Sequence, residues 1–231
     1  MIHGWGANIE KLAPLNKELK KLGWRIFIPK LPGFDRPPPK QLWGAKEYAR
    51  YVLTKSQKFF GKEKFFLFGH SFGGKITAKL ATMDNQSLSG IILCAPSGFS
   101  RTNSLKRIFF LVLAKIGKGL FIIPKIGQFS RKLLYKIARE HDYEKTQGIM
   151  KETFKKVIEE NLKTTIKKVK IPVLLLWGKQ DKMVPVKDAH YIKKVLPKAH
   201  LVIFNQEGHR LPYSKPKEIA KKINKWSQNL S

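Results

Sequence analysis

Short apolar runs alternate with amphipathic stretches along the chain. The apolar runs predict strands over residues 24–28, 65–68, 91–94, 173–177 and 201–204. Apolar residues at helical spacing predict helices over about 9–22, 44–60, 72–83, 189–196 and 217–226. Strands that are apolar on both faces and alternate with helices are typical of α/β proteins. We therefore expect a mostly parallel sheet with helices on both faces.

One long segment interrupts this alternation. Between residues 97 and 171, helical patterns continue without a strand, which predicts a helical cap over residues 98–170 inserted into a core of 1–97 and 171–231. Two apolar runs of the cap, 108–114 and 120–123, are flanked by lysine and arginine. Three interpretations stay open: the roof of an apolar pocket, a segment lying on an anionic membrane, and plain packing on the core. The pocket roof is favoured.

The turn after residues 65–68 carries a recognisable pattern, Gly69-His70-Ser71-Phe72-Gly73. In a Gly-x-Ser-x-Gly turn, the serine sits on a strained connection between strand and helix, and its hydroxyl projects above the sheet. The flanking glycines let strand and helix approach without collision. A predicted apolar strand before the motif and a predicted helix after it argue against an incidental glycine-rich turn. Ser71 is therefore the candidate nucleophile.

A serine hydroxyl needs a neighbouring base, and the base needs an acid that holds it. With this motif, the acid follows the serine in the chain and the histidine follows the acid. Of six histidines, His209 lies in a loop after the last predicted strand; of five aspartates, Asp35 precedes the serine and Asp181 follows a strand through a short turn. We predict His209 as base and Asp181 as acid. The alternatives are a loop histidine bonded to backbone and an aspartate that caps the helix beyond Pro185.

Catalysis at a carbonyl also needs donors for the developing oxyanion. The backbone N–H of Phe72, at the start of the helix after the serine, supplies one. The loop His3-Gly4-Trp5-Gly6 is of the kind that supplies the second, through the N–H of Trp5. A glycine-rich turn with a buried tryptophan is the alternative interpretation of that loop.

These motifs together resemble those of the α/β-hydrolases, in particular esterases that carry a cap, and the similarity covers nearly the whole chain. The matching segments are His3-Gly4-Trp5-Gly6, Leu31-Pro32-Gly33-Phe34, Gly69-His70-Ser71-Phe72-Gly73-Gly74, residues 178–185 and Gly208-His209. The resemblance implies a Ser71–His209–Asp181 triad, an acyl-enzyme intermediate, and an oxyanion hole from Trp5 and Phe72. Serine at the turn disfavours relatives similar to haloalkane dehalogenases and epoxide hydrolases, which carry aspartate there.

The start of the chain departs from that family's pattern. In the family, the His-Gly loop follows a strand inside the sheet, whereas only Met1 and Ile2 precede His3 here. We expect either a start further upstream or an N-terminally shortened sheet element. On the first alternative, a chain extended by about ten apolar residues, a usual strand length, would be better folded and more active.

The net charge of +30 first suggests nucleic-acid binding, but the distribution argues against it. The charge comes from 38 lysines and only 8 arginines, and the densest stretch, residues 101–170, has a net +12. Concentrated arginine is the signature of specific nucleic-acid contacts, so no specific nucleic-acid partner is expected. A single cysteine excludes a disulfide framework. Without an evident secretory signal or membrane span, we expect a cytoplasmic protein.

The sequence therefore predicts a serine hydrolase that cleaves small to medium acyl esters or lactones, without cofactor or metal. Hydrolysis of a carbon–carbon bond or an amide by the same triad is one alternative, and a non-catalytic ligand- or surface-binding protein is another. Contact with a membrane surface is a weaker expectation. Neither the substrate nor the oligomeric state follows from the sequence.

Overall fold

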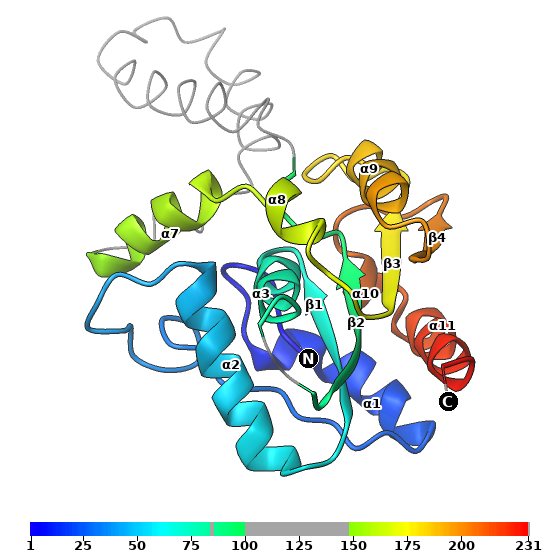
Figure 1. The fold of residues 1–231 in the computed structure, drawn as a ribbon, viewed down its shortest axis with the longest axis horizontal. Helices are drawn as coiled ribbons and strands as arrows, with labels where there is room; N and C mark the ends of the chain where they lie inside the picture. The colour runs from blue at the N-terminus through cyan, green and yellow to red at the C-terminus, as the bar shows by residue number, and fades with distance from the viewer. Residues whose placement is uncertain (84–85, 100–147, 231) are drawn as a thin grey trace, which may run out of the picture.

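The computed structural model describes residues 1–83, 86–99 and 148–230 (Figure 1). Within these ranges, a sheet of parallel strands has the order β1-β2-β3-β4. The strands are β1 (Phe65–His70), β2 (Leu88–Cys94), β3 (Val173–Gly178) and β4 (His200–Phe204). These elements confirm four of the strands that the apolar runs predict, and the α/β fold class with them.

Helices cover both faces of this sheet, as expected. The described helices are η1 (Ile9–Leu12), α1 (Ala13–Lys21), α2 (Ala45–Phe60), α3 (Phe72–Leu80), α7 (Ile149–Glu159), α8 (Lys163–Ile166), α9 (Lys187–Val195), α10 (Leu211–Ser214) and α11 (Pro216–Gln228). Figure 1 shows α1 and α11 on one side of the strands and α2 and α3 on the other.

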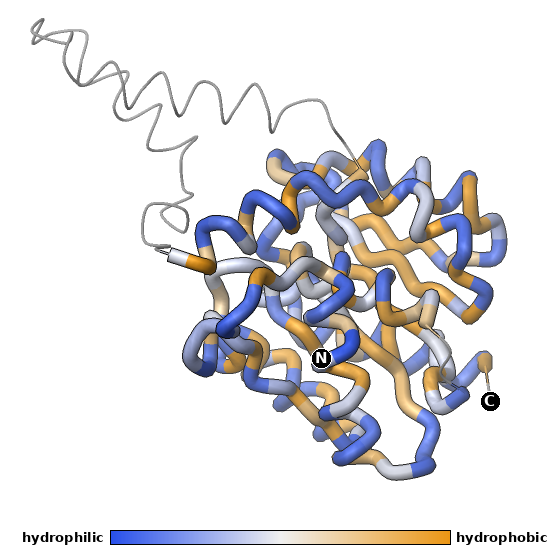
Figure 2. The backbone as a smooth tube through the Cα atoms, turned by 60° about the vertical axis from the view of Figure 1, so that its left-hand side comes forward, coloured by the Kyte–Doolittle hydropathy of each residue, from blue (hydrophilic) through white to orange (hydrophobic). Residues whose placement is uncertain are grey.

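Alternate residues of each strand enter two separate apolar cores. In β3, Leu175 and Trp177 join the core formed with α2, α3 and α9, whereas Leu174 and Leu176 join the core formed with α1 and α11. Successive side chains of a strand point to opposite faces, so a strand buried on both faces is apolar throughout. Figure 2 shows this as continuous hydrophobic colour along the strands and mixed colour along the helices.

The first residues of the chain lie beside β1. Ile2 makes an isolated parallel bridge with Gly69; its N–H donates to the carbonyl of Phe68 (2.8 Å), and its carbonyl accepts from the N–H of His70 (3.1 Å). This pairing thus places His3 at the same edge of the sheet as the end of β1.

The strand predicted over residues 24–28 is wrong. The segment has no strand hydrogen-bonding pattern. It does lie beside the first residues of the chain, since the Met1 amine donates to the carbonyl of Phe27 (2.7 Å). This single hydrogen bond is not the ladder of bonds that defines a strand. The apolar pattern predicts extended chain correctly but not its pairing.

Residues 100–147 of the predicted cap lie outside the described residues, so the boundaries of the cap stay a prediction. The described return from this segment consists of α7 and α8, and Lys75 of α3 joins it to the core. Its buried ammonium donates to the carbonyl of Val157 and to that of Glu160 (2.8 Å). The N–H of Leu162 also donates to the carbonyl of Gly98 (2.8 Å).

Candidate active site

Ser71 occupies a strained turn between β1 and α3. Its backbone has φ 51° and ψ −111°, a region that residues with side chains rarely adopt. Its N–H donates to the carbonyl of Cys94 at the end of β2 (3.0 Å), and its carbonyl accepts from the N–H of Ser97 (3.1 Å). Strain of this kind persists only where the surroundings enforce it. Ser71 is partly exposed, which the predicted role as nucleophile requires.

The two glycines of the motif are required by close packing. A Cβ on Gly73 would lie 2.6 Å from the carbonyl oxygen of His3, and one on Gly69 would collide with the carbonyl of Gly73 and the hydroxyl of Thr77. No side chain fits at either position. The glycine spacing therefore brings the first loop of the chain, the end of β1 and the start of α3 together around Ser71.

His209 and Asp181 form a hydrogen-bonded pair. His209 Nδ1 lies 2.8 Å from Asp181 Oδ2, and the carboxylate side chain is fully buried while 12% of the histidine side chain is exposed. The other oxygen, Asp181 Oδ1, accepts the N–H groups of Met183 and Val184 (2.8 Å each). Both carboxylate oxygens are therefore fixed. Asp181 does not cap the helix beyond Pro185, because α9 begins at Lys187 with Val186 at its N-cap and no side-chain cap, and the Asp181 bonds stay within the preceding turn.

The topology of the sheet places this pair at the same edge as Ser71. Asp181 follows β3 and His209 follows β4, so both lie at the carboxyl-terminal edge where β1 delivers Ser71. The ring of His70, the neighbour of Ser71, is centred 4.9 Å from the ring of His209. Among the described residues, the Ser71 hydroxyl makes no hydrogen bond to His209. Such catalytic contacts often close only when substrate binds.

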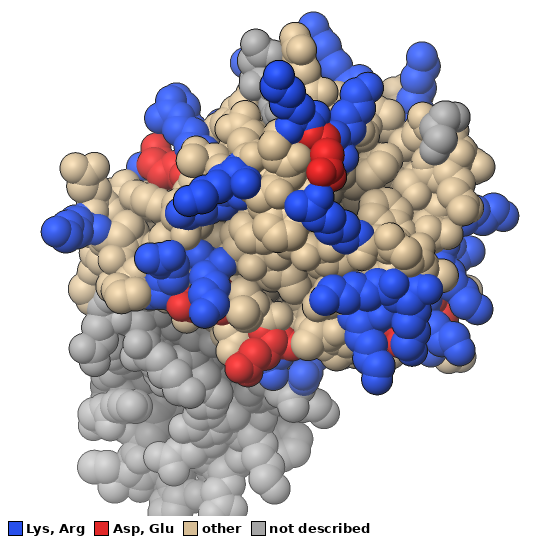
Figure 3. Space-filling view, turned by 90° about the horizontal axis from the view of Figure 1, so that it is seen from below, with Lys and Arg blue, Asp and Glu red and all other residues tan. Residues whose placement is uncertain are grey.

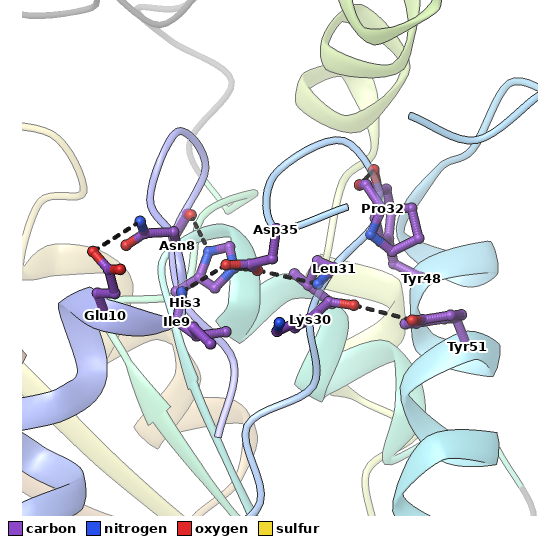
Figure 4. Close-up of polar contacts among 11 residues, drawn as sticks. His3, Asn8, Ile9, Glu10, Lys30, Leu31, Pro32, Asp35, Tyr48 and Tyr51 are labelled. Carbon is purple, nitrogen blue, oxygen red and sulfur yellow. Dashed lines mark hydrogen bonds and ion pairs between the residues drawn. The ribbon is translucent and has the colours of Figure 1, made fainter. Parts of the chain in front are cut away.

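A second histidine–aspartate pair lies nearby and has different chemistry. His3 Nε2 is 3.0 Å from Asp35 Oδ2 and its Nδ1 is 2.8 Å from the carbonyl of Gly4, in a fully buried ring (Figure 4). Both ring nitrogens are occupied, so neither can take a proton from Ser71. In contrast, the contact of His209 with Asp181 leaves Nε2 for a nucleophile. Chain order alone sets Asp35 aside as the acid, and the geometry agrees.

His70 holds the backbone of the candidate base. Its Nε2 lies 2.9 Å from the carbonyl of His209, and its Nδ1 lies 3.1 Å from the hydroxyl of Tyr213. Burial, with a smaller contribution from the nearby His209, lowers the pKa of His70 to about 3, so the ring is neutral near pH 7. The carbonyl accepts, so Nε2 donates and Nδ1 accepts from Tyr213.

Tyr213 is a residue of the candidate site that the sequence pattern does not predict. Burial raises the pKa of Tyr213 to about 12, which keeps its hydroxyl protonated as the donor to His70. Tyr213 lies in α10, four residues beyond His209, so one turn of helix returns it to the loop that carries the base. Nothing in the sequence marks it, because a tyrosine in a short apolar turn is read as core.

The two residues predicted for the oxyanion hole lie together beside Ser71. A Cβ on Gly4 would be 3.5 Å from the Cβ of Ser71, which places the first loop against the nucleophile. The rings of Trp5 and Phe72 are centred 5.1 Å apart, and Trp5 also contacts Phe34 and Phe154. The candidate site therefore has an aromatic wall next to Ser71.

Other kinds of site find no support in the described part of the chain. Residues 1–83, 86–99 and 148–230 contain no group of three or more histidine, cysteine or carboxylate side chains placed to hold a metal ion. The helices of the same residues include none that is long and apolar enough to cross a membrane.

A family model and several known proteins are similar to this chain over most of its length. The model of a family described as "Serine aminopeptidase, S33" matches residues 1–213. Pimeloyl-[acyl-carrier protein] methyl ester esterase of Aliivibrio fischeri (strain MJ11) is 23% identical over 224 residues, covering 90% of this chain and 85% of that protein. Lipase 1 of Psychrobacter immobilis is 24% identical over 224 residues, covering 90% of this chain and 70% of that protein.

Solved structures show the same fold at low identity. A thermophilic esterase from Thermogutta terrifontis has a TM-score of 0.73 at 17% identity, covering 99% of this chain and 88% of that chain. A monoacylglycerol lipase of Paleococcus ferrophilus has a TM-score of 0.69 at 20% identity, covering 100% of this chain and 93% of that chain.

Proposed function

The chain belongs to the serine aminopeptidase S33 family of α/β-hydrolases, and from that premise we propose that it hydrolyses carboxylic esters through a Ser71–His209–Asp181 triad. The observation that carries the proposal is the 2.8 Å contact between His209 Nδ1 and the buried Asp181 carboxylate, at the sheet edge that also carries the strained Ser71. The relatives named above act on esters and lipids, which supports the ester class.

Each residue has a defined task in the proposed reaction. Ser71 Oγ attacks the ester carbonyl while His209 Nε2 takes its proton, and Asp181 holds the ring and stabilises the imidazolium that forms. The N–H groups of Trp5 and Phe72 bind the oxyanion. His209 then gives the proton to the departing alcohol, which leaves an acyl-Ser71 ester. His209 next removes a proton from water, and the attack of that water releases the acid and restores Ser71.

The surroundings of Ser71 favour an apolar acyl or alcohol group. The aromatic wall of Trp5, Phe34, Phe72 and Phe154 lies beside the first loop and would bury such a group. The predicted roof over residues 98–170 would extend this wall, but most of it lies outside the described residues. Small to medium acyl esters or lactones are therefore the proposed substrates.

A series of p-nitrophenyl esters from acetate to decanoate tests the proposal. We expect turnover by the wild type without added metal, and a loss of about 10³-fold or more in kcat for Ser71→Ala. Ser56→Ala, which alters a buried serine in α2, is the matched control and should keep wild-type kcat. A fluorophosphonate should label the wild type and the control but not Ser71→Ala.

Other outcomes would replace parts of the proposal. Cleavage of aminoacyl p-nitroanilides or of diketones with intact esters, still dependent on Ser71, would keep the triad and change the substrate class. Absence of both turnover and labelling in folded wild-type protein would indicate a non-catalytic binding protein.

A further inference from the structure

Asp35 lies outside the candidate triad, yet its buried carboxylate makes three polar contacts. Its side chain is 5% exposed. Oδ2 faces His3 Nε2 (3.0 Å) and accepts the N–H of Leu31 (3.1 Å), and Oδ1 accepts the N–H of Ile9 (2.8 Å). Figure 4 shows these groups converging on the carboxylate. A buried carboxylate with three donors is a fixed part of the structure.

The partners of Asp35 bracket the first loop of the chain. His3 precedes Gly4-Trp5 and Ile9 follows Asn8, so the carboxylate ties both ends of the segment that contains Trp5. Asp35 itself belongs to residues 31–36, where the bridge between Pro32 and Arg36 closes a turn.

The turn that carries Asp35 is held on the rest of the molecule. The hydroxyls of Tyr48 and Tyr51, both on α2, donate to the carbonyls of Pro32 (2.9 Å) and Lys30 (3.0 Å), as Figure 4 shows. The carboxylate therefore links the first loop to a helix packed in the core.

His3 carries this constraint to one particular peptide group. Its Nδ1 faces the carbonyl oxygen of Gly4 (2.8 Å) while Nε2 faces Asp35. The two ring nitrogens therefore join the Asp35 carboxylate to the carbonyl of Gly4 through one rigid ring. The carbonyl of Gly4 and the N–H of Trp5 belong to the same planar trans peptide and point in opposite directions. Fixing the carbonyl toward His3 therefore fixes the N–H of Trp5 away from it.

We propose that Asp35 and His3 are positioning residues that orient the Gly4–Trp5 peptide so that its N–H faces the oxyanion. This inference rests on the proposed function, because it assigns the Trp5 N–H to the oxyanion hole. Asp35 acts through His3 and touches no reacting atom. Its contribution is in preorganisation, since an oxyanion donor is effective only when it is aimed before charge develops.

Steady-state kinetics with p-nitrophenyl butyrate test the proposal on the full chain. For Asp35→Asn, which keeps the side-chain shape, we expect kcat to fall about 10-fold or more with less than about a twofold change in KM, because the oxyanion exists only in the transition state. The control Asn224→Ala removes the 2.9 Å bond from the Trp24 indole to α11, another long-range contact away from the site. This control should keep kcat within about twofold of wild type, although the loss of its hydrogen bond lowers the thermal midpoint of unfolding.

A double variant tests whether Asp35 and His3 act together or independently on kcat. If Asp35 acts through His3, the variant His3→Ala/Asp35→Ala loses no more kcat than the worse single variant. Multiplied losses, or a kcat for Asp35→Asn within twofold of wild type, would overturn the proposal.

Amide hydrogen exchange tests the same structure without any enzyme activity, so failure of the ester proposal would be recognised separately. For Asp35→Ala we expect about 10-fold or faster exchange in peptides covering residues 3–9, because the Ile9 N–H loses its acceptor and the loop loses both ties. Asn224→Ala should leave that exchange unchanged. Equal exchange in wild type and Asp35→Ala would contradict the positioning role even if the wild type proved inactive on esters.

Discussion

His70 shows how one side chain can hold a site together while taking no proton in the reaction. It donates to the backbone of His209 and accepts from Tyr213, and it can do both only while neutral. Burial supplies that neutrality, and the neighbouring His209 and His3 oppose a charge on the ring as well. Protonation would remove the acceptor for Tyr213 and place a charge in the core.

The pH dependence of stability should report this neutral ring. The pKa of His70 is about 3 in the folded chain and about 6.5 when unfolded, so between these values the unfolded state binds the extra proton. The contribution of the neutral His70 ring to the free energy of unfolding is complete above about pH 6.5 and is lost as the pH falls toward about 3. The limiting slope is about 1.4 kcal/mol per pH unit. Urea unfolding from pH 7 to pH 5 should therefore show a shallower decline for His70→Gln than for wild type. Parallel declines would show that His70 is not held neutral.

At the scale of elements, burial explains which predictions succeed. β1 to β4 are sandwiched between two helical layers, so their apolar runs are unbroken and predictable. Lys75 shows the opposite case. A lysine in a predicted helix is read as solvent-exposed, yet it is buried under the end of α7, and burial lowers its pKa to about 8. Its position depends on a helix more than seventy residues away in the chain, which local periodicity does not see.

The packing of three elements at the Ser71 turn predicts the effect of one methyl group. Gly73→Ala would place a Cβ 2.6 Å from the His3 carbonyl, so α3 and the first loop must separate. We expect a loss of about 2 kcal/mol or more in unfolding free energy and a kcat at least about 10-fold lower in the molecules that fold. The measurements are urea unfolding and active-site-titrated turnover.

Gly23→Ala is the matched control for that change. Gly23 has φ +85° but no atom within 4 Å of an added Cβ. It should cost about 1 kcal/mol through backbone strain and leave turnover per folded molecule unchanged. A Gly73→Ala protein as active as this control would argue against the close approach.

At the scale of the whole molecule, the excess of lysine and arginine over aspartate and glutamate is the main electrostatic feature. On the face seen in Figure 3, Lys and Arg side chains lie across much of the surface with few Asp or Glu among them. The net charge of +30 nonetheless creates a positive potential around the protein. This potential attracts anions in general without selecting one.

The salt dependence of turnover should reveal that potential. Between 20 mM and 500 mM NaCl, we expect kcat/KM for the anionic p-nitrophenyl hemisuccinate to fall about threefold or more, because salt screens the attraction. The neutral p-nitrophenyl butyrate should change by less than about 1.5-fold. The same response for both esters would mean that the charge does not reach the site.

The sequence by itself determined the class of fold and the three residues of the candidate triad. Four unbroken apolar runs predict strands buried on both faces, and the Gly69-to-Gly73 motif between a strand and a helix predicts the turn that carries Ser71. With few histidines and aspartates in the chain, topological order selects His209 and Asp181, and the structure brings these two together.

Only the tertiary structure decided which residues support that site. Asp35, His3 and Tyr213 lie far from Ser71 or from one another in the chain. Their contacts arise where the first loop meets residues 31–36 and where the end of β1 meets α10. The missing strand at residues 24–28 is also a tertiary matter, because the apolar pattern does not say which segment pairs with these residues. Local periodicity records burial, whereas partnership depends on which distant segments the fold brings into contact.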